Sequence, residues 1–569
     1  MSEVLKSVSK KSIDNEFYSP YPQGYKKGKT KYVVVFGTVM SGLGKGILGS
    51  SLGKLLKYKG LKVAPIKFDG YLNQDAGTLN PFRHGEVFVL DDGTESDMDL
   101  GTYERFLDLN ITKSNYMTSG KLFQKILNKE RKGDYLGRDV QVIPHVTGEI
   151  KLFLRQLSME SDADIVLFEV GGTAGDLENM YCIEACRQLM YEEGEENICF
   201  IALTYILEPQ FLGEQKSKAA QLGIKNLMSL GIQPDIIGCR AHNPVSTKVR
   251  EKISVYSNVL LENVISLHDV KSIYLIPEML NESKIAENVL DILNLKQKAS
   301  KSEEEKSLKE WSKITDNIKK IKKTVKIGMI GKYTSLRDAY ASMIKALEHS
   351  GIELGCDVEI KWIETTDIEK GKTTPKEMLK DVDGVIVAPG FGKRGTEGKI
   401  ACVQYVREND IPYLGVCYGM QMAVIEFARN VCGIKGANTT ETEPDAKHKV
   451  VDILPEQKKV EGLGGNMRLG GKDVDVKENT VAYKLYGKQK RIRERFRHRY
   501  EVNPEYIKQL EDKGMVFSGK HPKYEIMQIM ELPNKRYFVG AQFHPEFTSR
   551  PGKPNPLYFG LVKAALDGK

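Results

Sequence analysis

At 569 residues the chain is too long for a single hydrophobic core, so its length predicts two domains joined by a linker. Hydrophobic residues make up 41% and charged residues 28% of the sequence, which is ordinary for a soluble globular protein. The net charge of +8 is small for this length. It does not call for nucleic acid as a partner, and it suits small polyanionic ligands such as nucleotides.

Apolar runs and cysteines bear on where the protein works. No run reaches membrane-spanning length and no signal peptide opens the sequence, which favours a cytoplasmic protein without a membrane partner. The eight cysteines are scattered without metal-ligand spacing, as expected of thiols in a reducing compartment. Residues 1–30 are polar and rich in lysine, and we interpret them as a partly disordered extension.

The first domain, predicted over 31–295, opens with KYVVVFG (31–37), a β-branched run typical of a buried parallel strand. A glycine-rich loop with Lys45 follows, and then an amphipathic helix that we expect to end at Gly60. Strand, glycine-rich loop, lysine and helix form an architecture that cradles phosphate groups. It is not a regular Walker A motif, because Gly46 stands where a magnesium-binding hydroxyl is expected. The alternative is a glycine-rich turn that binds nothing.

Several charged residues follow buried strands in this domain. Lys67 and Asp69 lie at a strand end, where open α/β sheets bind ligands. Glu169 lies inside an apolar run, where a carboxylate is costly unless it is paired or bound to a metal. We therefore predict that Glu169 and Asp99, which comes from an acidic loop, hold Mg²⁺ through their oxygens. The alternatives are a merely solvated acidic loop and, for the basic residues further on, ordinary surface positions: Lys216, Lys218, Arg240 and Lys252.

The second half of the chain repeats the pattern of alternating strands and helices. The segment 296–324 is dominated by charge, and we interpret it as a partly helical linker. Strands and helices alternate again over 325–569, which predicts a second domain. The predicted fold class is therefore α/β with two domains, the first built on a P-loop-like parallel sheet.

A possible nucleophile lies in this second domain. In PYLGVCYGMQMAVIEFARN (412–430), Cys417 stands between Gly415 and Gly419, the spacing of a nucleophile elbow between a strand and a helix. The helix N-terminus would favour a thiolate there. Far downstream, His544 and Glu546 can serve as base and orienting carboxylate. A buried structural cysteine is the alternative, but the set of three favours thiol-dependent acyl transfer. The loop after a preceding strand, 389–392, could supply oxyanion donors.

The chain resembles the CTP synthase family over about 30–565. The motifs that carry the resemblance are SGLGKG, HGEVFV, DMDLGTYERF, GDYLGRDVQVIPH, EVGGTAGDLE, GIQPDIIGCR, GVCYGMQ, RHRYEVN and QFHPEFTS. The resemblance implies an amidoligase (synthetase) domain followed by a class I glutamine amidotransferase domain. It implies that glutamine is hydrolysed at Cys417 and that ammonia passes internally. ATP then phosphorylates the 4-oxygen of UTP, and ammonia displaces that phosphate to give CTP, in de novo pyrimidine nucleotide synthesis.

The resemblance also assigns residues by motif position. It implies ATP contacts at Gly42, Leu43, Gly44, Lys45, Gly46, Lys67, Asp99, Arg240, Asp269 and Val270. For UTP and the inhibitory product CTP it implies Ser41, Asp176, Leu177, Glu178, Lys216, Gln221 and Lys252. For glutamine it implies Gly390, Tyr418, Gly419, Met420, Gln421, Glu441 and Arg499. The implied catalytic residues are Cys417, His544 and Glu546, and the implied Mg²⁺ ligands are Asp99 and Glu169. GTP activation, a homotetramer and filaments are further family properties that the resemblance implies.

This sequence departs from the family pattern at several positions. Gly42 replaces a serine in the phosphate loop, and Gly70 replaces a proline, which would loosen the loop after Asp69. Pro389 removes one backbone N–H beside the expected oxyanion donor at Gly390. Tyr418 replaces a leucine, and its larger ring would narrow the glutamine pocket. Two further departures are His268 for a lysine and the KSKAAQ loop (216–221). We expect all of these departures to change affinities more than activity, because no catalytic position is lost.

Two other functions stay open at this stage. The departures motivate a non-catalytic, nucleotide-sensing protein that assembles into filaments. Retention of every expected catalytic position argues against it. A glutaminase that supplies ammonia to another protein is the second alternative, and the nucleotide-binding pattern of the first half argues against that one.

Overall fold

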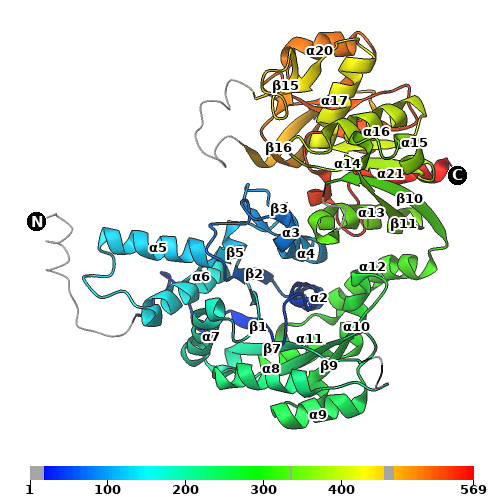
Figure 1. The fold of residues 1–569 in the computed structure, drawn as a ribbon. Coiled ribbons are helices and arrows are strands. Elements are labelled where there is room, and N and C mark those ends of the chain that lie inside the picture. Colours follow the sequence, from blue (N-terminus) through cyan, green and yellow to red (C-terminus); the bar gives the residue numbers. More distant parts are fainter. Residues whose placement is uncertain (1–17, 210, 212, 333–335, 454–466, 569) are drawn as a thin grey trace, which may run out of the picture. The chain divides into compact units, whose positions relative to one another are not determined.

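The computed structural model describes residues 18–209, 211, 213–332, 336–453 and 467–568. Their contacts form two compact units (Figure 1). Unit 1 comprises the chain up to Thr78 together with Thr102–Thr315, and unit 2 comprises Leu79–Gly101 together with Asp316–Lys569. Both units are α/β, which confirms the predicted fold class.

Unit 1 is built on a seven-stranded sheet in which every neighbouring pair is parallel, in the order β5-β2-β6-β1-β7-β8-β9. Its central strands are buried along almost their whole length, because helices cover both faces. The strands are β1 (Lys31–Gly37), β2 (Val63–Asp69), β5 (Tyr116–Thr118), β6 (Ile165–Val170), β7 (Ile198–Tyr205), β8 (Ile236–Ala241) and β9 (Val264–His268).

One face of this sheet packs its alternate residues, among them Tyr32, Val34 and Phe36, against one large apolar cluster. The helices that contribute to it are α5 (Ser119–Lys132), α6 (Thr147–Glu160), α7 (Met180–Glu193), α8 (Lys218–Ser229) and α9 (Thr247–Ser257). On the other side α2 (Lys45–Tyr58) contacts β1, β2 and β6, and it is itself covered by α10 (Ile276–Glu282) and α11 (Ile285–Ile292). The helix α2 ends two residues before the expected Gly60.

The N-terminal segment is attached to unit 1 in its described part. Residues 1–17 lie outside the described residues, but from Tyr18 onward the chain is packed against α6 and α7 by its tyrosines. Tyr18 donates to Glu149 at 2.7 Å, and Tyr25 donates to Glu193 at 2.9 Å. The partners lie more than a hundred residues away in sequence, so composition alone does not reveal these contacts.

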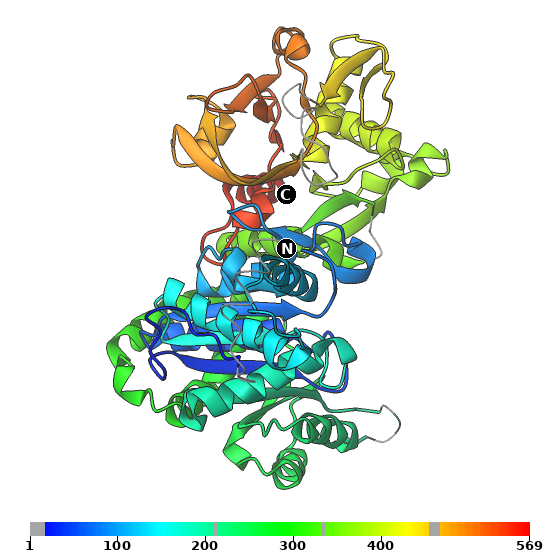
Figure 2. The same cartoon turned by 90° about the vertical axis from the view of Figure 1, so that its left-hand side faces the viewer.

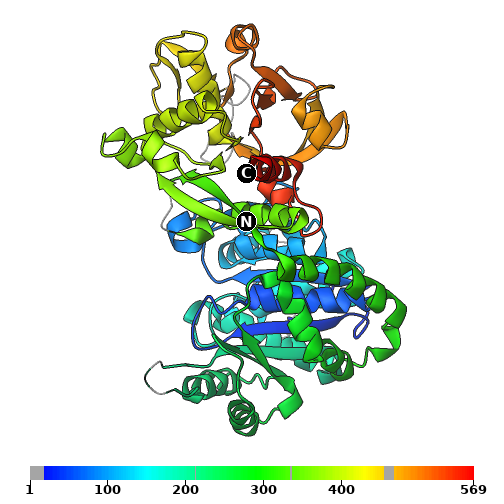
Figure 3. The ribbon, with the colours of Figure 1, turned by 90° about the vertical axis from the view of Figure 1, so that its right-hand side faces the viewer.

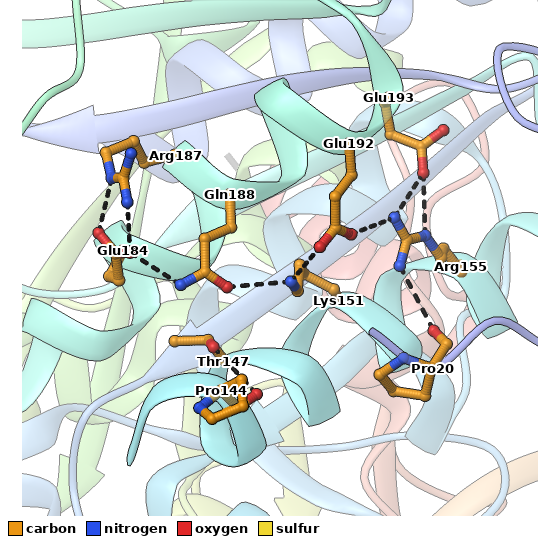
Figure 4. Close-up of polar contacts among 10 residues, drawn as sticks. All are labelled: Pro20, Pro144, Thr147, Lys151, Arg155, Glu184, Arg187, Gln188, Glu192 and Glu193. Atoms are coloured by element: carbon orange, nitrogen blue, oxygen red, sulfur yellow. Dashed lines mark hydrogen bonds and ion pairs between the residues drawn. The ribbon is translucent and has the colours of Figure 1, made fainter. Parts of the chain in front are cut away.

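A buried arginine is central to this attachment (Figure 4). Arg155 on α6 is fully buried, and its guanidinium donates to Glu192 and Glu193 at 2.7 Å each. It also donates to the carbonyl of Pro20 at 3.4 Å and lies 3.9 Å from the centroid of the Tyr21 ring. The buried charge is therefore paired on one side and stacked against an aromatic ring on the other.

The charged segment predicted as a linker forms α12 (Lys301–Lys320), and unit 1 ends within it at Thr315. Its first part is attached to unit 1 by a tryptophan. Trp311 is buried, its indole N–H donates to the carbonyl of Tyr274 at 3.1 Å, and Lys54 lies 4.1 Å from the centroid of its ring. The buried Trp311, within a run of lysines and glutamates, therefore packs this part of α12 against unit 1.

Unit 2 contains a nine-stranded mixed sheet in the order β11-β10-β12-β13-β21-β20-β19-β16-β17. Neighbours from β11 to β21 are parallel, and those from β21 to β17 are antiparallel. The antiparallel end, orange in Figure 2, curls strongly. The strands are β10 (Lys323–Gly331), β11 (Cys356–Glu364), β12 (Gly384–Val387), β13 (Tyr413–Val416), β16 (Arg468–Val476), β17 (Arg491–His498), β19 (Val516–Lys520), β20 (Met527–Glu531) and β21 (Phe538–Ala541).

Helices cover both faces of the parallel part of this sheet. On one face α13 (Ala341–Leu354) packs beside α21 (Pro556–Asp567), the green and red helices of Figure 3. On the other face lie α16 (Thr396–Glu408) and α17 (Tyr418–Asn430). Shorter elements complete the unit: α14 (Thr366–Glu369), α15 (Pro375–Leu379), α19 (Val481–Leu485), α20 (Pro504–Glu511), β14 (Ala437–Thr439), β15 (His448–Asp452) and β18 (Glu501–Val502).

The segment Leu79–Gly101 belongs to unit 2 by its contacts, although we expected it within a first domain over 31–295. It contains α3 (Pro81–His84) and the hairpin of β3 (Val87–Val89) and β4 (Glu95–Asp97), after which α4 (Met98–Leu107) begins. The hairpin is bound to β17 by ion pairs, Asp91 with Arg493 at 2.8 Å and Glu95 with Arg497 at 2.6 Å. These opposite charges are some 400 positions apart, which sequence patterns do not connect.

Among the described residues, no helix combines the length and apolar character needed to cross a bilayer.

Candidate active site

Cys417 occupies a strained turn between β13 and α17. Its backbone has φ 49° and ψ −100°, and its N–H donates to the carbonyl of Ala541 on the adjacent β21 at 2.7 Å. A Cβ on Gly419 would lie 2.2 Å from the carbonyl oxygen of Val387, and one on Gly415 would lie 2.7 Å from the backbone of Gly419. Glycine is therefore required on both sides, and the predicted nucleophile elbow is present.

His544 and Glu546 lie beside this turn, after the end of β21. The Nδ1 atom of His544 is 2.8 Å from a carboxylate oxygen of Glu546, and both side chains are buried. Burial on its own lowers the pKa of His544, but the negative charge of Glu546 and the adjacent Cys417 sulfur outweigh it and raise that pKa to about 10. A protonated imidazole next to a thiol nucleophile can donate its proton to a leaving amine.

Several residues that support this group were not predicted from the sequence. Gln542 donates to the Cys417 sulfur at 3.6 Å, the Phe547 ring stacks on the His544 imidazole at 5.0 Å between centroids, and Tyr558 donates to Glu546 at 3.4 Å. Gln542 and Phe547 stand within the QFHPEFTS motif itself, so that motif already contained the signal. Tyr558 lies on α21, and nothing in its local sequence distinguishes it.

Glu441, expected to bind glutamine, lies against the glycine-rich loop after β12. One of its oxygens accepts the N–H of Gly392 at 2.7 Å. Burial raises the pKa of Glu441, while Gly392, Lys399 and Arg499 act in the opposite direction. The Gly392 N–H already donates to Glu441, so it is not available to an oxyanion in this structure. The role of Gly390 as an oxyanion donor stays a prediction. Lys399 is a buried cation that the sequence analysis did not single out.

Tyr418 was expected to narrow the glutamine pocket. Its ring is buried, and its hydroxyl lies 2.8 Å from that of Thr396, on the first turn of α16. The ammonium of Lys399 lies 4.9 Å from the centroid of the ring. Burial and the neighbouring Lys332 lower the pKa of Lys399 to about 8. The phenol therefore joins α17 to α16 and covers a buried lysine.

Two more of the residues expected to bind glutamine, Gln421 and Arg499, have defined neighbours. Gln421 is buried on the first turn of α17 and donates to the carbonyl of Tyr500 at 3.0 Å. Arg499 follows β17 directly and lies close enough to Glu441 to oppose the rise of its pKa. Gly419 and Met420 belong to the same first turn of α17. All the residues predicted for catalysis and for glutamine therefore lie in unit 2.

The phosphate-binding candidates lie in unit 1. The loop between β1 and α2 contains Gly42 and Gly44, with φ of 75° and 90°, and Gly44 is the N-cap of α2. Lys45 opens that helix, and its ammonium donates to the carbonyl of Gly172 at 2.7 Å. A loop with left-handed glycines at a helix N-terminus points backbone N–H groups toward an anion. Ser41, Leu43 and Gly46 complete the predicted stretch.

Lys67 and Glu169 face each other on neighbouring strands. They are directly paired in the register of β2 and β6, with Nζ 4.0 Å from a carboxylate oxygen of Glu169. Glu169 is only 1% exposed and accepts a hydrogen bond from Tyr103 at 2.9 Å. Asp99, the other predicted ligand, lies in unit 2 at the start of α4.

This chemistry fits Mg²⁺. The ion prefers oxygen donors and is often held by one or two carboxylates together with substrate phosphates. A cage of three protein ligands, which the described residues do not contain, is therefore not required. A buried carboxylate beside lysines, at the end of a parallel strand, is a suitable place for such an ion.

The residues predicted for UTP and CTP lie on several elements of unit 1. Asp176 accepts the N–H of Thr173 at 2.7 Å, and Leu177 and Glu178 open a short 3₁₀ helix (Leu177–Asn179). A Cβ on Gly70 would lie 2.7 Å from Asn179, so this glycine permits close packing against the 3₁₀ helix, and the expected loosening of the loop stays a prediction. Of the remainder, Gln221 is buried on α8, Lys216 is half-buried and Lys252 is exposed.

Arg240 and Asp269, both predicted to approach the adenine, are brought together. Arg240 lies on β8, Asp269 follows β9, and the two form an ion pair in which Asp269 also contacts His242 at 2.6 Å. Arg240 and His242 lower the pKa of Asp269. Val270 follows directly, so the three candidates share one edge of the sheet.

Comparisons with known proteins agree with this arrangement. Residues 31–295 match the family described as CTP synthase N-terminus, and residues 335–564 match glutamine amidotransferase class-I. The chain is 48% identical to the CTP synthase of Pyrococcus furiosus over 541 residues, which cover 95% of this chain and 98% of that protein. It is 47% identical to the CTP synthase of Methanopyrus kandleri over 535 residues, covering 94% and 99%.

The chain belongs to the CTP synthase family. Its relatives are matched along nearly their whole length, so both halves of the family's architecture are present. Among solved structures, the glutaminase domain of Trypanosoma brucei CTPS with bound acivicin is 36% identical, with a TM-score of 0.40 and coverage of 43% of this chain and 94% of that one. The two family matches and the curated relatives confirm the family resemblance seen in the motifs.

Proposed function

We propose that this protein makes CTP from UTP, with ATP as the phosphate donor and glutamine as the nitrogen source. The observation that carries the proposal is the arrangement of Cys417, His544 and Glu546 in unit 2 of a chain whose unit 1 has a glycine-rich loop at the N-terminus of α2. A thiol nucleophile releases ammonia from an amide, and a nucleotide-binding unit can consume it. Family membership supports both halves of this assignment.

In unit 2 the Cys417 sulfur attacks the side-chain amide of glutamine. His544 donates its proton to the departing ammonia, and Glu546 holds the imidazole in the orientation that this transfer needs. Water then hydrolyses the thioester and releases glutamate. We assign the α-ammonium group of glutamine to Glu441 and its α-carboxylate to Arg499, because each side chain has the charge opposite to that of the group it would bind. The remaining assigned residues are Gly390, Tyr418, Gly419, Met420 and Gln421.

In unit 1 the γ-phosphate of ATP is transferred to the 4-oxygen of UTP. An amide-like carbonyl is a poor electrophile, so phosphorylation gives C4 a leaving group. Ammonia that has passed internally then adds at C4, and phosphate departs to leave CTP. Lys45 and Lys67 stabilise the charge on the transferred phosphoryl group, with further contacts to ATP from 42–46, Arg240, Asp269 and Val270.

We assign Mg²⁺ to Asp99 and Glu169. When bound, the ion neutralises phosphate charge and orients the transferred group. Glu169, together with Lys67, keeps the polyphosphate close to the carboxyl ends of β2 and β6. Activity that disappears on removal of divalent cations and returns on addition of Mg²⁺ is the expected result.

We assign the pyrimidine nucleotide to Ser41, Asp176, Leu177, Glu178, Lys216, Gln221 and Lys252. CTP, as the product, would compete with UTP there. We further propose activation by GTP, assembly as a homotetramer with the capacity to form filaments, and residence in the cytoplasm. A reducing compartment suits a thiol nucleophile, and all eight cysteines are free.

The direct test is to incubate the protein with UTP, ATP and Mg²⁺ and to measure CTP with glutamine and, separately, with ammonium chloride. CTP should form with either nitrogen source. Absence of CTP with both would reject the proposal. CTP with ammonia alone would reject the role assigned to unit 2, and glutamate release without any CTP would make the protein a glutaminase.

A further inference from the structure

The buried carboxylate of Glu494, on β17, has no part in the proposed chemistry. Glu494 on β17 is only 3% exposed, and its two oxygens accept three hydrogen bonds. The hydroxyl of Tyr486 donates at 2.7 Å, that of Thr548 at 2.8 Å, and the side-chain amide of Asn555 at 2.9 Å. These donors come from three separate places: the residue after α19, the end of the turn after His544, and the residue before α21.

Two of the three donors flank the residues that hold Glu546. Thr548 is the last residue of the 3₁₀ turn η9 (Pro545–Thr548), which carries Glu546. Asn555 caps α21 by accepting the N–H of Leu557 at 3.0 Å, and Tyr558 in the first turn of that helix donates to Glu546 at 3.4 Å. Asn555 also donates to Thr548 at 3.0 Å.

We propose that Glu494 is a positioning residue for glutamine hydrolysis, which holds η9 and the start of α21 together so that Glu546 keeps its orientation against His544. The inference rests on the proposed glutaminase activity. Glu494 touches neither substrate nor the reacting atoms, and it acts only through Thr548 and Asn555.

The ionised form of Glu494 suits this role. A carboxylate accepts all three donors, whereas a carboxylic acid carries a proton at one oxygen. Burial raises the pKa of Glu494 to about 7, although Tyr486, Thr548, Asn555 and the charge of Arg495 act to lower it. Because the folded-state pKa is raised, the ionised form is present above about pH 7 and is lost as the pH falls through that value.

Protonation has a defined consequence for the turn. The hydroxyl of Thr548 lies 3.1 Å from the carbonyl of Pro545 as well as 2.8 Å from Glu494. A hydroxyl has one proton to donate. Once Glu494 is protonated, Thr548 can accept from it and donate to Pro545 instead. The direction of the hydrogen bond between Thr548 and Glu494 then reverses, two residues after Glu546.

The test compares Glu494→Ala with Glu494→Gln. Alanine leaves three buried donors without their acceptor, so kcat for glutamine hydrolysis should fall by between about tenfold and about a hundredfold, as displaced catalytic groups do. KM for glutamine should stay within about twofold, because the glutamine-binding residues lie elsewhere, and ammonia-dependent CTP formation should stay within about twofold. Wild-type kcat should decrease as the pH falls through about 7, because protonation of Glu494 reverses the link to Thr548. Glu494→Gln keeps the hydrogen-bonded packing but can only donate to Thr548, as protonated Glu494 would. Its kcat should therefore exceed that of Glu494→Ala, stay below that of wild type above pH 7, and show no decrease as the pH falls through about 7.

The matched control is Glu531→Ala. Glu531 on β20 is also buried, and it accepts the N–H groups of Val481 and Ala482 at 2.8 and 3.1 Å, away from η9. It should lower thermal stability without a selective loss of kcat. If Glu494→Ala fails to fold, Thr548→Val, which breaks one link, provides the same readouts.

The inference is overturned if Glu494→Ala retains its glutaminase kcat, if KM alone changes, or if Glu531→Ala gives the same selective loss. Glutamine hydrolysis is followed as glutamate release, so it can be scored without CTP formation. A wild-type protein that hydrolyses glutamine and makes no CTP would contradict the proposed synthetase function and leave this inference standing. A wild-type protein that releases no glutamate would overturn both.

Discussion

The charge on His544 is the residue-scale feature on which glutamine hydrolysis depends. Its pKa is raised to about 10, so the imidazolium is present at neutral pH and is lost as the pH rises through that value. Because His544 donates a proton to the departing ammonia, kcat for glutamine hydrolysis should show an alkaline limb near pH 10. Glu546→Gln removes the charge that raises the pKa and should move this limb to lower pH. A wild-type limb centred near pH 7 would contradict the assignment.

Tyr418 provides a second test at this scale. Tyr418→Phe keeps the ring over Lys399 and removes the hydroxyl that contacts Thr396. Loss of one buried hydrogen bond costs about 1 kcal/mol. If glutamine binding loses that free energy, its KM should rise by about fivefold. Ammonia-dependent CTP formation should not change. Steady-state kinetics with both nitrogen sources measure this, and an unchanged KM would show that the phenol serves the fold only.

At the scale of elements, the attachment of the N-terminal segment to α6 and α7 makes a stability prediction. Arg155→Ala leaves the fully buried Glu193 without its cation, while Glu192 keeps its ion pair with Lys151, and the change should cost about 3–5 kcal/mol. Arg187 is a matched control on α7 (Figure 4), because it pairs with Glu184 only three residues away and is 46% exposed. Its removal should cost less than about 1 kcal/mol. Thermal unfolding of the two variants should therefore differ clearly, and equal shifts would refute the attachment.

Local patterns made some elements predictable from the sequence. The strand, turn and helix around Cys417 follow from glycines two positions away on either side, and the phosphate loop follows from residues within one short stretch. The attachments of Tyr18, Tyr25 and the β3–β4 hairpin depend on partners more than a hundred positions away. Periodicity and composition carry no signal for such pairs, and the same holds for the three donors that meet at Glu494.

The residues of the candidate sites also differ in whether a short motif could predict them. Cys417, His544 and Glu546 stand in short motifs, so the sequence could name them, and the structure brings them together. Supporting residues such as Tyr558 and Lys399 act through packing across helices, which no motif records. Departures from the family pattern were also hard to judge from letters alone. Gly70 allows a close approach that only the folded backbone reveals.

For the whole molecule, the central claim is that unit 2 releases ammonia and unit 1 consumes it. The two activities have separate requirements: a thiol for glutamine, and nucleotides with Mg²⁺ for CTP formation. A divalent-cation chelator should abolish CTP formation with either nitrogen source, and added Mg²⁺ should restore it. Persistent CTP formation without a divalent cation would contradict the roles given to Asp99 and Glu169.

The most direct measurement is CTP formation by Cys417→Ala with glutamine and with ammonium chloride, each compared with wild type. We expect no detectable CTP with glutamine and near-wild-type rates with ammonia, because only the acyl step needs the sulfur. Equal loss with both nitrogen sources, or retention of glutamine-dependent CTP formation, would contradict the division of labour between the two units.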